Sequence, residues 1–149
     1  MTDDDISECI NGLLEVTSDG TAAFHAAAGD VRSEEARALL LDRAGRLGRA
    51  ASALRALTIA HGLNGHPRAV GDRAPRIAPA DEADILTECE RREAAVIVAY
   101  RDALEQKLPD SVRAVVTREF EQLLASLGTL RAARDRAARQ HREVVGRAV

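Results

Sequence analysis

The chain has no tryptophan, and among its 149 residues there are only one tyrosine and two phenylalanines. A buried core must therefore consist mainly of aliphatic side chains. Alanine, leucine, arginine and glutamate dominate the sequence, as they do in soluble helical proteins. A single domain spanning residues 1–149 is expected, because a chain of this length can bury roughly two-thirds of its unfolded surface.

Long apolar runs are also missing. No stretch approaches the roughly 18 apolar residues that are needed to span a bilayer. The acidic segment Asp3–Asp5 is the opposite of the basic start of a signal peptide. A net charge of −3 favours neither a membrane nor a nucleic acid as partner. These features predict a cytoplasmic protein.

Cysteine and histidine are scarce. Cys9 and Cys89 fall on apolar helical stripes without a Cys-x-x-Cys spacing, so we interpret them as core residues rather than as a disulfide or a metal pair. His25 is expected to point outward. For His61 and His66 we favour solvent exposure over opportunistic metal binding.

Apolar residues recur at helical spacing in four segments, with helices expected at about 4–28, 33–62, 81–107 and 110–140. No segment shows the alternation of a strand. The expected inward-facing positions are Ile6, Ile10, Leu13, Thr17, Phe24 and Ala27 in the first helix, Ala36, Leu40, Arg43, Leu47, Ala50, Leu54 and Leu57 in the second, Leu86, Cys89, Glu93, Val96, Tyr100 and Ala103 in the third, and Val112, Val116, Phe120, Leu123, Leu127 and Leu130 in the fourth.

Local signals mark several helix boundaries. Ser33 is a good N-cap for the second helix, and Gly62 stands where that helix should stop. The segment Pro109–Ser111 predicts a tight connection, so the third and fourth helices should form an antiparallel hairpin. Gly20 lies inside the first helix and marks either a close helix contact or a local bend.

The segment 63–80 holds three of the four prolines, Pro67, Pro75 and Pro79. Neighbouring antiparallel helices need only about 2–8 connecting residues, so a link of this length predicts a crossover that runs along the whole bundle. A helix pair, a long crossover and a second helix pair is the order of the ferritin-like fold. The sequence therefore predicts an all-α, ferritin-like four-helix bundle.

Two charged residues interrupt the apolar stripes. Glu93 stands between Cys89 and Val96, and Arg43 occupies a similar place in the second helix. A buried lone carboxylate is costly unless it has a cation, a metal or a proton. If the second and third helices lie side by side, Arg43 and Glu93 can form an ion pair that fixes the register of the helices. The alternative is a partial metal site formed by Glu93 with Glu90.

Several segments resemble a bacterial ferritin-like family of unknown function, whose members are four-helix-bundle proteins. The segments that carry the resemblance are Leu14–Glu15, Asp19–Gly20 and Phe24–Val31 in the first helix, Ile85–Ala95 and Ala99–Leu104 in the third, and Leu130–Asp135 in the fourth. None of these motifs is catalytic. The resemblance implies a ferritin-like bundle with the long crossover, and it leaves the chemistry open.

Ferritin-like di-metal proteins take a Glu from each of two helices and Glu-x-x-His from each of the others. Here Glu90-x-x-Glu93 alone resembles a ligand pair, and Glu15 or Asp19 could add a carboxylate from the first helix. The second helix has Asp42–Leu47 where Glu-x-x-His is wanted. The fourth has Leu127 where relatives often have histidine. We therefore expect no complete di-metal site, no cofactor and no catalytic residue.

Three functions follow from these observations. The leading hypothesis is a non-enzymatic bundle that acts through an unknown protein partner or by self-association, for example as a homodimer that pairs Ile97 and Val98. The alternative is a di-iron or di-manganese carboxylate protein with ferroxidase- or peroxidase-like activity that uses Glu90 and Glu93.

A third possibility is nucleic-acid binding through the arginine-rich segment after Leu130. We favour the simpler interpretation that these arginines complement the negative end of the fourth helix and keep it solvated.

Overall fold

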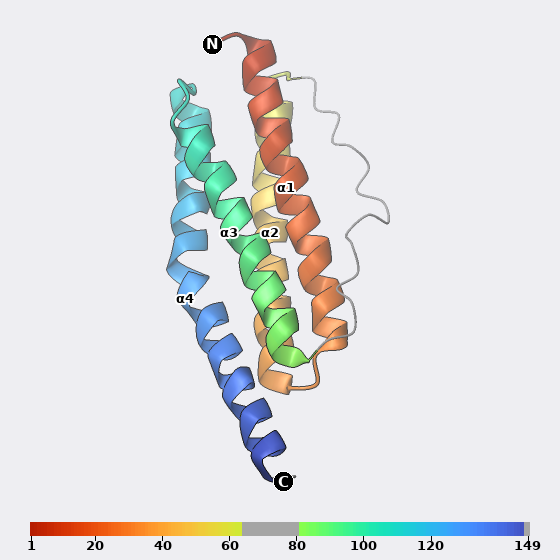
Figure 1. Ribbon diagram of the computed structural model, residues 1–149. Coiled ribbons are helices and arrows are strands. Elements are labelled where there is room, and N and C mark those ends of the chain that lie inside the picture. The colour runs from red at the N-terminus through yellow and green to blue at the C-terminus, as the bar shows by residue number, and fades with distance from the viewer. Residues whose placement is uncertain (64–80, 148–149) are drawn as a thin grey trace.

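A computed structural model describes residues 1–63 and 81–147, and within these ranges the chain forms four α-helices and no strand. The helices are α1 (Asp3–Asp30), α2 (Glu34–Ala60), α3 (Glu82–Leu104) and α4 (Asp110–Arg147) (Figure 1). The prediction of an all-α protein with four helices is confirmed. Apart from Leu63, the predicted crossover lies outside the described residues, and a single domain stays a prediction.

Side-chain caps explain where the helices begin. Thr2 and Asp5 form a reciprocal capping box at the start of α1. Ser33 accepts a hydrogen bond from the Ala36 amide at 3.0 Å, which confirms it as the N-cap of α2. Asp81 caps α3 in the same way through the Asp84 amide at 2.9 Å.

Two helix ends differ from the predictions. α3 ends at Leu104 rather than near Lys107, and Arg113 of α4 donates to the Leu104 carbonyl at 2.9 Å. This bond satisfies one of the carbonyls that a helix end leaves without a partner. α4 continues to Arg147, seven residues beyond the predicted end; no proline follows position 140, and the first glycine after it, Gly146, lies at the end of the helix.

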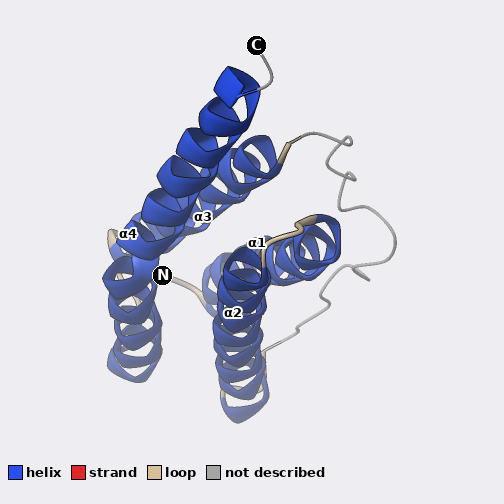
Figure 2. Cartoon of the chain, turned by 90° about the horizontal axis from the view of Figure 1, so that it is seen from below, coloured by secondary structure: helices blue, strands red, loops and turns tan. Residues whose placement is uncertain are grey.

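The helices form two antiparallel hairpins, α1 with α2 and α3 with α4, which lie against each other (Figure 2). α1 packs against α3, and α2 packs against α4. Across the diagonals, no described Cα atom of α2 approaches one of α3 within 8 Å, and the same is true of α1 and α4. The side-by-side packing of α2 and α3, on which the predicted Arg43–Glu93 pair was made conditional, is therefore not found.

Hydrogen bonds at the two ends of the bundle set the direction of the hairpins. Glu82 at the start of α3 accepts from the Ser33 amide at 2.8 Å, so α3 begins beside the start of α2. His61 Nε2 lies 3.1 Å from Ser111 Oγ, so α2 ends beside the start of α4. α2 and α3 thus run parallel, and the end of α2 and the start of α3 lie at opposite ends of the bundle (Figure 1).

Every inward-facing position predicted for α1, α2 and α3 is buried. In α4 the prediction is wrong at Phe120 and Leu127, which are only partly buried, while Glu119 and Ser126 take the inward positions. The buried residues of α4 follow an unbroken seven-residue repeat, which the polar side chains conceal. They are Val112, Val116, Glu119, Leu123, Ser126, Leu130, Ala133 and Ala137.

Gly20 lies at a close approach of three helices. A Cβ atom at this position would lie 3.0 Å from Leu47 Cδ1 and 3.6 Å from Val96 Cγ2. Of the two interpretations left open by the sequence, the structure therefore supports a close helix contact. Glycine costs about 1 kcal/mol in a helix relative to alanine, and here it gives room to α2 and α3.

Ile97 and Val98 of α3 were predicted to pair in a homodimer. Ile97 is buried within the bundle and so cannot do this, whereas Val98 is 48% exposed. In the described part of the chain, none of the helices combines the length and the apolar character that a membrane-spanning helix requires.

Candidate functional site

The centre of the bundle holds an ion pair between Arg43 of α2 and Glu93 of α3. Their side chains are 2% and 1% exposed. The guanidinium crosses the diagonal of the bundle, because α2 and α3 do not pack directly on each other. Among the described residues, no third group hydrogen-bonds to the Arg43 Nη atoms or to the Glu93 carboxylate. Each charge is therefore compensated mainly by the other.

Burial disfavours the charged form of Arg43 and lowers its pKa to about 10. This value still leaves the guanidinium protonated at neutral pH. A protonated guanidinium has no acceptor atom that could coordinate a metal ion. Its positive charge also repels a metal cation. The central position of the bundle is thus occupied by a fixed positive charge bound to Glu93.

Glu90, one turn before Glu93, is bound by two arginines of α4. Its carboxylate accepts a hydrogen bond from Arg131 Nε at 3.0 Å and forms a second ion pair with Arg134. Both carboxylates of the Glu90-x-x-Glu93 pair are therefore neutralised by guanidinium groups from other helices. Arg136 of α4 pairs likewise with Glu35 of α2. From the sequence, these arginines were expected to complement the negative end of the helix dipole. In the structure, Arg131, Arg134 and Arg136 instead form ion pairs with carboxylates of α2 and α3.

The residues present do not fit a di-metal site. Within residues 1–63 and 81–147, no group of three or more His, Cys, Asp or Glu side chains converges in a way that could hold a metal ion. Glu15 and Asp19 are exposed on α1, so neither joins the buried pair in the core. His25 and His61 are exposed, in agreement with the predictions, and His66 lies outside the described residues.

A second polar group lies in the core between α1 and α3. The Thr17 hydroxyl donates to the Leu13 carbonyl at 2.6 Å, so its oxygen is free to accept from the Tyr100 hydroxyl at 3.2 Å. Burial raises the pKa of Tyr100 to about 12, and the negative charge of Glu119 acts in the same direction. Glu119 is only 7% exposed and is paired with Arg118 at 3.2 Å.

The two cysteines are free thiols in different surroundings. Cys89 is fully buried, as predicted, and burial raises its pKa to about 12. Cys9 is only partly buried, and burial raises its pKa to a smaller extent. Its thiol faces a groove that the sequence did not indicate.

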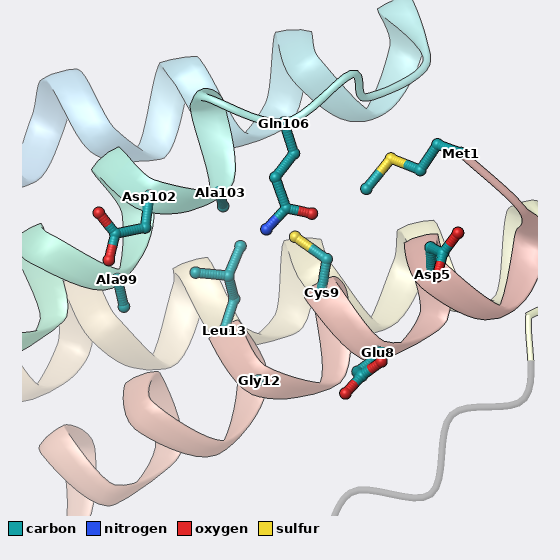
Figure 3. Close-up of a pocket in the computed structure, with 10 residues that line it drawn as sticks. All are labelled: Met1, Asp5, Glu8, Cys9, Gly12, Leu13, Ala99, Asp102, Ala103 and Gln106. Carbon is teal, nitrogen blue, oxygen red and sulfur yellow. The ribbon is translucent and has the colours of Figure 1, made fainter.

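This groove, of about 610 Å³, lies between the start of α1 and the end of α3. Cys9, Leu13 and Gln106 point into the space between the two helices (Figure 3). The exposed acidic residues Asp5, Glu8 and Asp102 are among those that line the same groove. No lysine or arginine side chain is among the described residues that line it. The groove therefore combines an apolar floor with an acidic margin.

Sequence reasoning missed two features of the core and surface. The burial of Glu119 was not predicted, because the neighbouring Phe120 is apolar and was assigned to the inward face. The seven-residue spacing from Val112 would have placed Glu119 on that face. The groove could not be found from the sequence, because it depends on how α1 and α3 are placed relative to each other.

No protein-family model matches this chain, and no curated protein matches it either.

Proposed function

We propose that this protein is a ferritin-like four-helix bundle without a complete di-metal site, and that it acts without catalysis, by self-association or by binding a protein partner. The observation that carries the proposal is the Arg43–Glu93 ion pair at the centre of the bundle. It places a guanidinium where a ferritin-like di-metal protein needs ligands. A cytoplasmic location is part of the same proposal.

The arrangement of the hairpins supports the ferritin-like part of the proposal. α2 and α3 run parallel, and the chain leaves α2 and enters α3 at opposite ends of the bundle. That order is expected for two hairpins joined by a long crossover. Fold alone does not assign an activity, so the charged side chains of the core decide against catalysis.

The absence of catalysis is supported by the state of the two candidate ligands. Glu90 is bound by Arg131 and Arg134, and Glu93 is bound by Arg43. A cation could enter only by displacing these guanidinium groups, and removing the partner of a buried charge is strongly unfavourable.

The test is the metal content of the full chain purified from cells grown with added iron and manganese. We expect far less than one metal ion per chain. A matched variant, Glu93→Gln, should give the same low value, because Glu93 is occupied by Arg43. One or two iron or manganese ions per chain, lost in Glu93→Gln together with peroxide turnover, would establish the di-metal alternative and end the proposal.

A further inference from the structure

The last turns of α4 extend beyond the part of the helix that packs into the bundle. Every residue from 139 to 147 is exposed, and His141, 4.0 Å from the Asp81 carboxylate, marks where α4 passes the start of α3. In Figure 1 this end of α4 lies beyond the other helices. We call residues 139–147 the α4 extension.

The α4 extension is basic and partly apolar. It carries Arg139, Arg142 and Arg147 against the single acidic residue Glu143, and none of these three arginines forms an ion pair with another described residue. Val144 and Val145 are 67% and 52% exposed. Val144 lies seven residues after Ala137 and so continues the face by which α4 packs into the bundle.

The groove between α1 and α3 has the opposite properties. The acidic residues Asp5, Glu8 and Asp102 are among those that line it, and side chains such as Leu13 form its floor. Asp5–Leu13 on α1 and residues 139–147 of α4 are each nine residues of helix, so each spans about 12 Å. A helix of the charge, apolar content and length of the α4 extension therefore suits this groove.

One chain cannot fill its own groove. The groove lies at the start of α1 and the end of α3, whereas the α4 extension lies beside the start of α3, at the other end of the bundle. We propose that the groove between α1 and α3 receives the α4 extension of a second copy of this chain. The inference specifies the self-association named in the proposed function and rests on it.

The contact is head-to-tail, because it joins two different surfaces. Such interfaces build rings when the rotation closes and open filaments when it does not. A nine-residue helix buries little area, so each contact is weak and the assembly depends on concentration. Its charges are exposed at the margin, so salt weakens it.

The first measurement is the molar mass of the full chain by light scattering and sedimentation over a wide concentration range. We expect the mass to grow with concentration in about 50 mM NaCl and to fall clearly in about 500 mM NaCl. Val144→Ser/Val145→Ser should weaken association at least tenfold, whereas Ile59→Ser, at an 82% exposed position of α2, should leave it unchanged. A monomer at every concentration would overturn the inference.

Charge reversal identifies the two surfaces. Arg139→Glu/Arg142→Glu in the α4 extension and Glu8→Lys/Asp102→Lys in the groove should each abolish association alone, because each places like charges opposite each other. Mixing the two variants should restore it, since the reversed extension then meets the reversed groove. The matched control is Arg49→Glu/Arg55→Glu, which reverses two exposed charges of α2.

The possible results separate the inference from the proposed function. Association that survives both reversals, or a mixture that stays monomeric, would overturn the head-to-tail contact. The metal content of the same preparations is independent of these results. A metal-free monomer would overturn the head-to-tail contact but agree with a non-catalytic bundle. An assembly that contains bound metal would contradict the non-catalytic bundle but not the head-to-tail contact.

Discussion

Arg43 and Glu93 form an ion pair although they stand on α2 and α3, two helices whose described Cα atoms nowhere approach within 8 Å. The length of the arginine side chain makes this contact possible. One turn further along α2 and α3, Gly20 brings α1 close to Leu47 and Val96. The pair therefore links the two hairpins through the middle of the bundle.

Removing one member of this pair should be far more costly than removing both. We expect Arg43→Met to lower the free energy of unfolding by about 3–5 kcal/mol, because it leaves the Glu93 carboxylate buried and alone. Arg43→Met/Glu93→Leu should restore the wild-type value or exceed it by about 1–4 kcal/mol. Urea unfolding followed by circular dichroism measures both.

Arg46→Met is the control for this experiment. Arg46 pairs with Asp42 at 2.9 Å, but the two side chains are 42% and 53% exposed. Its loss should change the free energy of unfolding by only about 0.3–0.5 kcal/mol. Equal effects of Arg43→Met and Arg46→Met would show that the Arg43–Glu93 pair is hydrated.

The close approach at Gly20 predicts a size limit. Gly20→Val should destabilise the protein by about 1–3 kcal/mol, because its side chain meets Leu47. Gly128→Ala should instead stabilise it by about 1 kcal/mol, since no atom lies within 4 Å of the added methyl group. Thermal unfolding of the two variants tests the contrast. A Gly20→Val protein as stable as the wild type would contradict the observed packing.

Alkaline pH should destabilise the protein through Tyr100. Its pKa is about 12 in the folded chain, above the ordinary value of 10.0, so the unfolded chain loses this proton first as the pH rises. The contribution of Tyr100 to the free energy of unfolding is complete below pH 10. It is lost by about pH 12, which lowers the free energy of unfolding by about 3 kcal/mol in all. Tyr100→Phe should flatten the pH dependence of urea unfolding in this window.

Because the chain has one tyrosine and no tryptophan, tyrosinate absorbance reports Tyr100 alone. The pKa of Cys89 is also raised, so ionisation of its thiol adds to the loss of stability at alkaline pH. The comparison of wild type with Tyr100→Phe should therefore be repeated in a Cys89→Ala background. Ionisation of Tyr100 near pH 10 in the folded protein would show that its hydroxyl is exposed.

Glu119 should contribute to this shift. Its negative charge disfavours tyrosinate, so Glu119→Gln is expected to lower the pKa of Tyr100. Burial is the larger cause, and the pKa should therefore stay above 10. The same absorbance titration measures the change, and Glu121→Gln on the exposed side of α4 is the control. An unchanged titration would place the Glu119 charge too far away to act.

Much of this fold could be predicted from the sequence, because local rules determine it. The apolar spacing of the first three helices and the N-cap at Ser33 are properties of neighbouring residues. Glu119 and Ser126 were missed because hydrophobicity favoured Phe120 and Leu127, although the seven-residue spacing selects the polar pair.

The Arg43–Glu93 pair was predicted as one of two alternatives, but for a side-by-side arrangement of α2 and α3. The partners of Glu90 were not predicted, because they lie on α4, more than 40 positions away. The groove and the position of the α4 extension depend on the packing of whole helices. No local pattern carries that information.

The central ion pair also has a consequence for the order of folding. Each hairpin consists of consecutive helices, so it can form from nearby residues, and such local contacts form quickly. Arg43 and Glu93 belong to different hairpins, and both keep their hydration water until the hairpins meet. Their dehydration therefore falls in the last step of assembly, and a chain with apolar residues at both positions should complete that step faster.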